Sequence, residues 1–243
     1  MGIPTHDEAT LICEMLANVF KVPECEVARI ICNILASRKC SSLREVHLVN
    51  NVDRMLSLLG GSFLRMSKQI EPSEFHDVNE LDSDVLSSTI LRCKIPTERE
   101  LLIHNGVTVY ISCDDITALT VEAIVCSNDR KLSSSSGLAK YISNLAGNEY
   151  MERCKERVKE RGLHTSDAVS IKTDNLGIII NVVVPRLTGI ASKTKLNKRG
   201  LYTRLLRASF ENAFEEARKC DVSRLALFPL GAGKFYVYLE RTY

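Results

Sequence analysis

Hydrophobic positions change their spacing partway along the chain. In the first quarter, apolar side chains recur every three or four residues, as they do on one face of a helix. This pattern predicts a helix over residues 11–20, a second helix that begins at Pro23, and a third that Ser41 or Ser42 caps, with Glu45 at the capping-box position. The three apolar stripes are Leu11, Ile12, Met15, Leu16, Val19 and Phe20, then Val27, Ile30, Ile31, Ile34 and Leu35, then Leu48, Val49, Val52, Met55, Leu56 and Leu59.

The second half of the chain has the pattern of strands that alternate with helices. Strands are predicted over residues 107–111, 121–126, 168–172, 177–184 and 222–228, and helices over residues 138–161 and 201–219. The segment 177–184 is nearly all apolar, as a strand buried on both faces should be. This alternation predicts an α/β domain with three layers, in which helices cover both faces of a mostly parallel central sheet.

An acidic, serine-rich stretch separates the two halves. Between residues 70 and 89 there are six acidic side chains and no Lys or Arg, which is typical of a solvated linker. The predicted domains are therefore an all-α helical bundle over residues 1–68, a linker over 69–94, and the α/β domain over 95–243. The bundle faintly resembles ubiquitin-binding modules of the CUE or UBA kind, but a packing or oligomerisation module is the favoured interpretation.

Composition and cysteine spacing argue against a membrane-spanning protein, a secreted protein and a metal-binding protein. The net charge is +2, and the longest apolar run is far shorter than a membrane span. The N-terminus has an acidic start and lacks the basic segment of a signal peptide. The nine cysteines are never spaced C-x-x-C, which argues against a metal site and against a disulfide framework. We therefore expect a reduced intracellular compartment, cytoplasmic or nuclear, and no membrane contact.

Three loops follow predicted strands and contain small or acidic residues. They are residues 114–117, residues 127–137 and residues 231–235. In an open α/β sheet a ligand binds outside the carboxyl ends of the strands, and small residues at a helix N-terminus let backbone N–H groups converge on an anion. Serine and glycine runs are often plain turns, but their shared position at strand ends favours a nucleotide diphosphate site.

The order of six motifs resembles that of a macro domain, the ADP-ribose-binding fold. The motifs are DDIT, VEAIV, a small-residue loop that closes in GLA, NLAG, IIINVVVPRL and ALFPLGAGKF, and they cover roughly residues 100–238. The resemblance is greatest to macro domains of multi-domain ADP-ribosyltransferases. It implies that ADP-ribose, free or attached to a protein, is the ligand and that no cofactor is needed.

The resemblance also implies a set of ligand-binding residues. Asp115 matches the aspartate that accepts a hydrogen bond from the adenine amino group, with the Ile116 backbone beside it. A helix N-cap is the alternative interpretation of Asp115. The first phosphate loop is Ser135, Ser136, Gly137 and Leu138, and the second is Gly231, Ala232, Gly233, Lys234 and Phe235.

Two departures from the family pattern argue against catalysis. Family members that hydrolyse ADP-ribose linkages carry N-A-A-N after the second strand, and here the last position is Asp129. An aspartate there can bind a ribose hydroxyl, but its charge is unfavourable beside a diphosphate. Ser135 and Ser136 replace glycines of the family's triple glycine. The resemblance therefore implies weakened binding, and no catalytic residue is assigned.

A second class of function stays open. Between Arg186 and Arg207, both included, the chain has seven basic residues and no acid, which suits nucleic-acid phosphates or a solvated loop. The alternative function is thus a degenerate macro fold that acts as a scaffold for protein or nucleic acid, with the helical module as a further protein contact. The resemblance also implies a helix after the second phosphate loop, so we expect the domain's C-terminal end to be incomplete.

Overall fold

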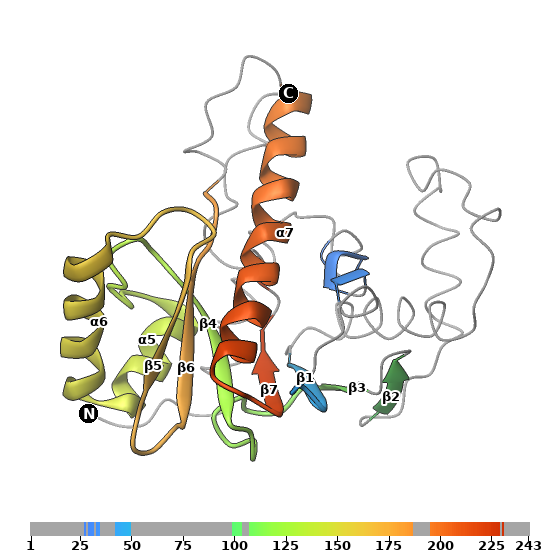
Figure 1. Ribbon diagram of the computed structural model, residues 1–243, viewed down its shortest axis with the longest axis horizontal. Coiled ribbons are helices and arrows are strands. Elements are labelled where there is room, and N and C mark those ends of the chain that lie inside the picture. The colour runs from blue at the N-terminus through green and yellow to red at the C-terminus, as the bar shows by residue number, and fades with distance from the viewer. Residues whose placement is uncertain are drawn as a thin grey trace.

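The computed structural model describes residues 27, 29–31, 33–34, 42–49, 99–103, 107–186, 195–228 and 230. Within them the strands are β1 (Glu45–Val49), β2 (Arg99–Ile103), β3 (Val107–Ser112), β4 (Ala123–Asn128), β5 (Ala168–Lys172), β6 (Ile178–Val183) and β7 (Arg224–Leu227). The labelled helices are α5 (Gly137–Ala146), α6 (Asn148–Arg161) and α7 (Lys195–Lys219). Together they form an α/β fold (Figure 1).

The strands of the described residues form one seven-stranded sheet in the order β2-β3-β1-β7-β4-β6-β5. The five inner strands β3, β1, β7, β4 and β6 pair in parallel. The edge strands β2 and β5 are antiparallel to their neighbours. The prediction of a mostly parallel central sheet is therefore confirmed.

Helices lie on both faces of the sheet, with α5 and α6 on one side and α7 on the other (Figure 1). Strand residues alternate between two apolar clusters, as the two-residue period of a strand requires. On β6, Ile180 and Val182 join the cluster that contains α7, whereas Ile179 and Val183 join the cluster that contains α5 and α6. Strand β6 is thus buried on both faces, which explains the apolar run over residues 177–184.

The helix predicted after Ser42 is wrong for residues 45–49, which form strand β1. Val46 and Leu48 are fully buried while Glu45 and His47 between them are partly exposed, a two-residue alternation. Both edges of β1 are paired, one with β3 and the other with β7. Those ladders satisfy the backbone on both sides, so tertiary pairing outweighs the local helical pattern.

The described residues between 27 and 34 are helical, as predicted, but they pack against the sheet. Val27, Ile30, Ile31 and Ile34 are buried in the same cluster as β1, β3, β7 and α7. This stripe therefore belongs to the core of the α/β fold rather than to a separate bundle. The predicted helix over 11–20 and the predicted linker over 69–94 lie outside the described residues.

Two further elements differ from the prediction. The single helix expected over 138–161 is two helices, α5 and α6, because Gly147 between them has a φ of 84°, in the left-handed region that only glycine adopts readily. Strand β2 was not predicted. It pairs with β3 and forms one edge of the sheet.

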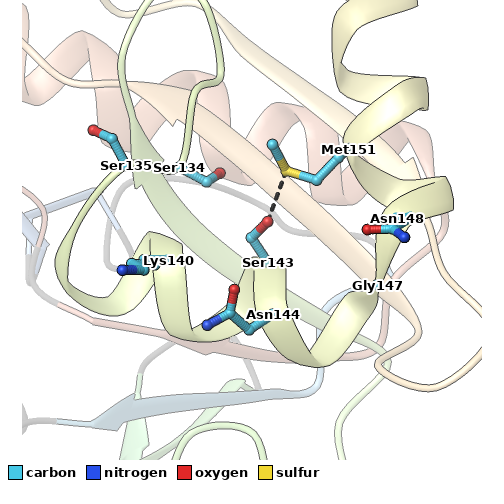
Figure 2. A pocket seen from close by; sticks show the side chains of 8 residues that line it. All are labelled: Ser134, Ser135, Lys140, Ser143, Asn144, Gly147, Asn148 and Met151. Atoms are coloured by element: carbon cyan, nitrogen blue, oxygen red, sulfur yellow. Dashed lines mark hydrogen bonds between the residues drawn. The ribbon is translucent and has the colours of Figure 1, made fainter. Parts of the chain in front are cut away.

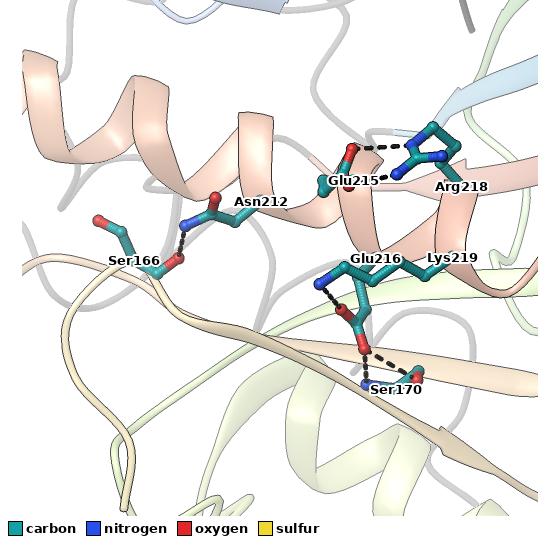
Figure 3. A network of polar contacts seen from close by, with 7 residues as sticks. All are labelled: Ser166, Ser170, Asn212, Glu215, Glu216, Arg218 and Lys219. Carbon is teal, nitrogen blue, oxygen red and sulfur yellow. Dashed lines mark hydrogen bonds and ion pairs between the residues drawn. The ribbon is translucent and has the colours of Figure 1, made fainter. Parts of the chain in front are cut away.

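Polar contacts attach α7 to the opposite edge of the sheet (Figure 3). Glu216 Oε1 accepts hydrogen bonds from the backbone N–H and the hydroxyl of Ser170 on the edge strand β5, at 3.3 and 3.1 Å. Asn212 Nδ2 donates to the Ser166 carbonyl at 2.8 Å. A carboxylate that occupies an edge-strand N–H blocks the pairing of further strands there. None of the described helices is both long and apolar enough to cross a membrane.

Candidate functional site

The carboxyl ends of β3 and β4 point to the same end of the sheet, because both strands run parallel to the strands between them. The loop that follows β3 holds Asp115. Its Oδ1 accepts hydrogen bonds from the backbone N–H of Thr117 at 2.9 Å and from the Thr117 hydroxyl at 2.7 Å. This local turn fixes the orientation of the carboxylate.

The environment of Asp115 favours the ionised form. Partial burial alone would raise its pKa, but the hydrogen bonds from Thr117 and from Tyr141 outweigh that effect and lower the pKa below its ordinary value. No helix follows Asp115; residues 116–118 form a turn, and the Ala118 N–H donates to the Asp115 carbonyl at 2.9 Å. The helix N-cap interpretation is therefore wrong. Ile116 is buried, which anchors the turn to the core.

The predicted first phosphate loop leads directly into α5. Ser136 is the N-cap residue, but its side chain makes no capping hydrogen bond, and the first turn contains no acidic residue. Gly137 has a φ of 60°, a left-handed conformation that favours glycine. Ser135, Ser136 and Gly137 are exposed, while Leu138 packs partly against the core. The N-terminus of α5 thus presents backbone N–H groups without a side-chain cap.

Tyr141 brings these two predicted parts of the site together. It lies one turn into α5, and its hydroxyl donates a hydrogen bond to Asp115 Oδ2 at 3.0 Å. The sequence analysis did not identify Tyr141 or Thr117 as site residues. The Asx-turn tendency of an Asp two residues before Thr117 was a usable signal, whereas nothing local to α5 indicates the contact of Tyr141.

Asp129 stabilises its own loop. Its Oδ1 accepts from the backbone N–H groups of Lys131 at 2.8 Å and Ser133 at 3.1 Å, and its Oδ2 accepts from the Ser133 hydroxyl. Burial raises the pKa of Asp129, but the bonds from Ser133, then the one from Lys131 and then the charge of Arg186 lower it overall. The carboxylate predicted to contact a ribose is thus an integral part of the loop between β4 and α5.

The same loop contains two non-glycine residues in the left-handed region. Leu132 has a φ of 48° and Ser134 a φ of 47°, and both are buried. Asn128, at the end of β4, makes two hydrogen bonds with Ser134. Its Oδ1 accepts from the Ser134 backbone N–H at 3.2 Å, and its Nδ2 donates to the Ser134 hydroxyl at 2.9 Å. Such backbone conformations persist only where the surroundings determine them, and they cluster at binding loops.

A buried polar cluster lies beneath this loop. Asn181 Oδ1 on β6 accepts from Asn128 Nδ2 at 3.1 Å and from the Tyr150 hydroxyl at 2.8 Å, while Asn181 Nδ2 has no partner among the described residues. Burial, with a smaller effect of the neighbouring Cys154, raises the pKa of the Cys126 thiol to about 12. Burial likewise raises the pKa of Cys154 to about 11. Neither thiol is a nucleophile at neutral pH.

A polar pocket of about 430 Å³ adjoins the first phosphate loop (Figure 2). Of the predicted site residues that the structure describes, Ser135 alone lines it. The Lys140 ammonium, exposed on α5, makes no ion pair with any described residue. Figure 2 shows the Ser143 hydroxyl pointing to Met151 on α6, to whose sulfur it donates at 2.7 Å. The lining residues are Ser134, Ser135, Lys140, Ser143, Asn144, Gly147, Asn148 and Met151.

The structure places only part of the predicted site. It links Asp115 to α5 through Tyr141, and it links Asp129 through Ser133 to the loop that leads into α5. The second phosphate loop, residues 231–235, lies outside the described residues, as do the side chains of most of the basic segment. Among the described residues no group of three His, Cys, Asp or Glu side chains is placed to bind a metal ion.

A comparison with protein families matches the second half of the chain. The family model described as Macro domain matches residues 125–243. The matched range begins within β4, so Asp115 and Ile116 precede it. No curated protein matches the chain.

Solved structures of macro domains resemble the chain at low identity. The macro domain of ganglioside induced differentiation associated protein 2 (GDAP2) is 25% identical over 47% of this chain and 53% of its own, with a TM-score of 0.39. The match thus spans about half of that chain. The Oceanobacillus iheyensis macrodomain with ADP is 24% identical over 54% of this chain and 67% of its own, with a TM-score of 0.45. The macrodomain of Mycobacterium tuberculosis DarG is 14% identical over 50% and 77%, with a TM-score of 0.37.

Proposed function

Because residues 125–243 match the macro domain family, we propose that this protein binds ADP-ribose, free or attached to another protein, and does not hydrolyse it. The proposal includes an intracellular location and a likeness to the macro domains of multi-domain ADP-ribosyltransferases. In this role the Asp115 carboxylate accepts a hydrogen bond from the adenine amino group, and the N-terminus of α5 faces the diphosphate.

The observation that carries the proposal is the fixed orientation of the Asp115 carboxylate. An exocyclic amino group is a hydrogen-bond donor, and an ionised carboxylate is purely an acceptor. Thr117 occupies Oδ1 and fixes the orientation of the group, which like any ordinary aspartate is ionised at neutral pH. Oδ2 is then the oxygen to which a donor from outside the turn can bind.

The start of α5 supports the diphosphate part of the proposal. A helix N-terminus carries a partial positive charge, and an anion is most stable where no capping side chain occupies the N–H groups. Ser136 leaves these groups uncapped, and the first turn lacks the acidic residue that would repel phosphate. Lys140 adds a positive charge one turn further along the helix.

The absence of hydrolysis is proposed from Asp129. Its carboxylate oxygens already accept three hydrogen bonds from the loop between β4 and α5, so it is poorly placed to orient a ribose and an attacking water. The expected test is release of ADP-ribose from a mono-ADP-ribosylated protein, which should not exceed the uncatalysed background. Robust release that survives Asp129→Ala would contradict this part of the proposal.

Isothermal titration with ADP-ribose tests the binding itself. Asp115→Ala should weaken binding by about 1–3 kcal/mol, the cost of removing one partner of a polar contact. Asp114→Ala is the matched control, because Asp114 is the exposed neighbour of Asp115 and has no described hydrogen bond. Equal affinity in the wild type and the Asp115→Ala protein would show that the adenine assignment is wrong. No detectable binding to the wild type would overturn the proposed function.

A further inference from the structure

The two oxygens of Asp115 have different partners. Oδ1 accepts two hydrogen bonds from Thr117, one from the backbone and one from the hydroxyl. A carboxylate oxygen offers about two lone-pair positions, so Oδ1 has no further capacity. Any additional donor must therefore bind at Oδ2.

Oδ2 already accepts a hydrogen bond from the hydroxyl of Tyr141 at 3.0 Å. Tyr141 offers this oxygen a donor at the edge of a planar ring, and so does the amino group of an adenine. An incoming adenine must therefore share Oδ2 with Tyr141 or displace it. Sharing weakens both hydrogen bonds, since two donors then draw on one oxygen.

We propose that Tyr141 is an affinity-determining residue of this site, whose hydroxyl competes with the amino group of the ligand for Asp115 Oδ2. The inference rests on the proposed function. Its consequence is that the ligand either shares the oxygen, with two weakened hydrogen bonds, or first displaces Tyr141. In both cases the affinity is lower than it would be without the Tyr141 hydroxyl.

The position of Tyr141 makes this exchange inexpensive. Its side chain is 44% exposed, so turning it into the solvent loses little apolar burial. The hydrogen bond to Asp115 is the one that the structure records for its hydroxyl. The carboxylate keeps its orientation when Tyr141 leaves, because Thr117 holds the other oxygen independently.

Competition of this kind lowers the affinity of every ligand that uses Asp115. A base or nucleoside must overcome it with the energy of base contacts alone. A ligand that also carries a diphosphate gains additional binding energy at the uncapped N-terminus of α5, only one turn away. Tyr141 should therefore lower the affinity for adenosine and the affinity for ADP-ribose by the same factor. Because adenosine binds more weakly, its binding is the first to become undetectable.

Calorimetric titration with ADP-ribose of the wild type, Tyr141→Phe and Leu145→Ala tests the inference. Tyr141→Phe keeps the ring and removes the competing donor, so it should bind about two- to tenfold more tightly, the range for one net hydrogen bond. Leu145→Ala is the matched control: Leu145 lies on the same flank of α5 and is 41% exposed, and its side chain has no hydrogen bond to Asp115. Its affinity should equal that of the wild type.

A second measurement does not depend on the ligand. In a carbon-13 NMR titration, Tyr141→Phe should raise the pKa of the Asp115 carboxyl group, because it removes a hydrogen bond that favours the ionised form. An unchanged pKa, or wild-type binding with no gain in Tyr141→Phe, would overturn the inference and leave the proposed function standing. Binding by Tyr141→Phe alone would support the competition and overturn the proposed function of the natural chain. A failure of both proteins to bind would overturn both.

Discussion

Asn128 and Asn181 lie on neighbouring strands, and Asn128 Nδ2 donates a hydrogen bond to Asn181 Oδ1 at 3.1 Å. Both side chains are buried, and the same Asn181 oxygen accepts the hydroxyl of Tyr150 from α6. Because Asn128 also holds Ser134, this contact links β6 to the loop that leads into α5. The loop is thus fixed from the interior of the protein.

Asn181→Leu should lower the free energy of unfolding by about 1–3 kcal/mol, because Asn128 Nδ2 and the Tyr150 hydroxyl lose a buried acceptor. Losing Asn181 Nδ2 itself should cost little, since that atom has no partner among the described residues. Urea unfolding measures the change. Asn144→Ala, on the exposed side of α5, is the control. Equal stability of Asn181→Leu and the wild type would show that the buried cluster does not stabilise the fold.

Asp129 should make stability depend on pH in acid. Its pKa is lower in the folded protein than the value of about 3.9 for an unfolded chain. Its stabilising contribution is therefore fully present above that unfolded value and is lost as the pH falls through the folded pKa. Asp129→Asn should unfold at lower urea concentration than the wild type at pH 7, and the gap should narrow below about pH 4. A gap of constant size would contradict the prediction.

The described cysteines should differ widely in reactivity. Cys113 is exposed, while Cys126 and Cys154 are buried with raised thiol pKa values. Brief alkylation of the native protein at pH 8 should modify Cys113 and spare the two buried thiols. Peptide mass spectrometry distinguishes the sites. Labelling of Cys126 before the protein unfolds would show that the α5 side of the sheet opens readily.

Strand β1 should be essential to the whole fold. Leu48→Ala removes a fully buried side chain from a central strand and should cost about 2–5 kcal/mol. Arg44→Ala, at the exposed residue before the strand, is the control. Hydrogen exchange of amides in β4 and β6 should accelerate in Leu48→Ala. Unchanged exchange there would mean that β1 belongs to a separately folding unit.

Sequence patterns predicted the fold class and most elements of the second half. Strand β6 was predictable because a strand that is buried on both faces leaves a nearly continuous apolar run. Strand β1 was not, because Leu48 and Val49 fit the helical stripe that continues to Leu59 until their partners are known. Those partners, on β3 and β7, are remote in the sequence. Pairing between distant segments leaves no local pattern to detect.

The candidate site was predictable only where its geometry is local. The turn at Asp115 and the start of α5 follow from residue types within a few positions of one another. The contact of Tyr141 with Asp115 and that of Asn128 with Asn181 join separate elements, and chain spacing encodes neither. The Asn181 side chain had one visible signal, as a polar residue within the otherwise apolar segment 178–183.

The central place of β1 has a consequence for synthesis on the ribosome. This strand is made before every other strand of the described sheet, yet one of its neighbours, β7, is made after all of them. Until β7 emerges, β1 and β4 each have an unpaired edge beside apolar side chains, and nascent chains in that state aggregate readily. Pairing between such distant segments also folds slowly. The growing chain should therefore depend on chaperones that shield strand edges until translation passes β7.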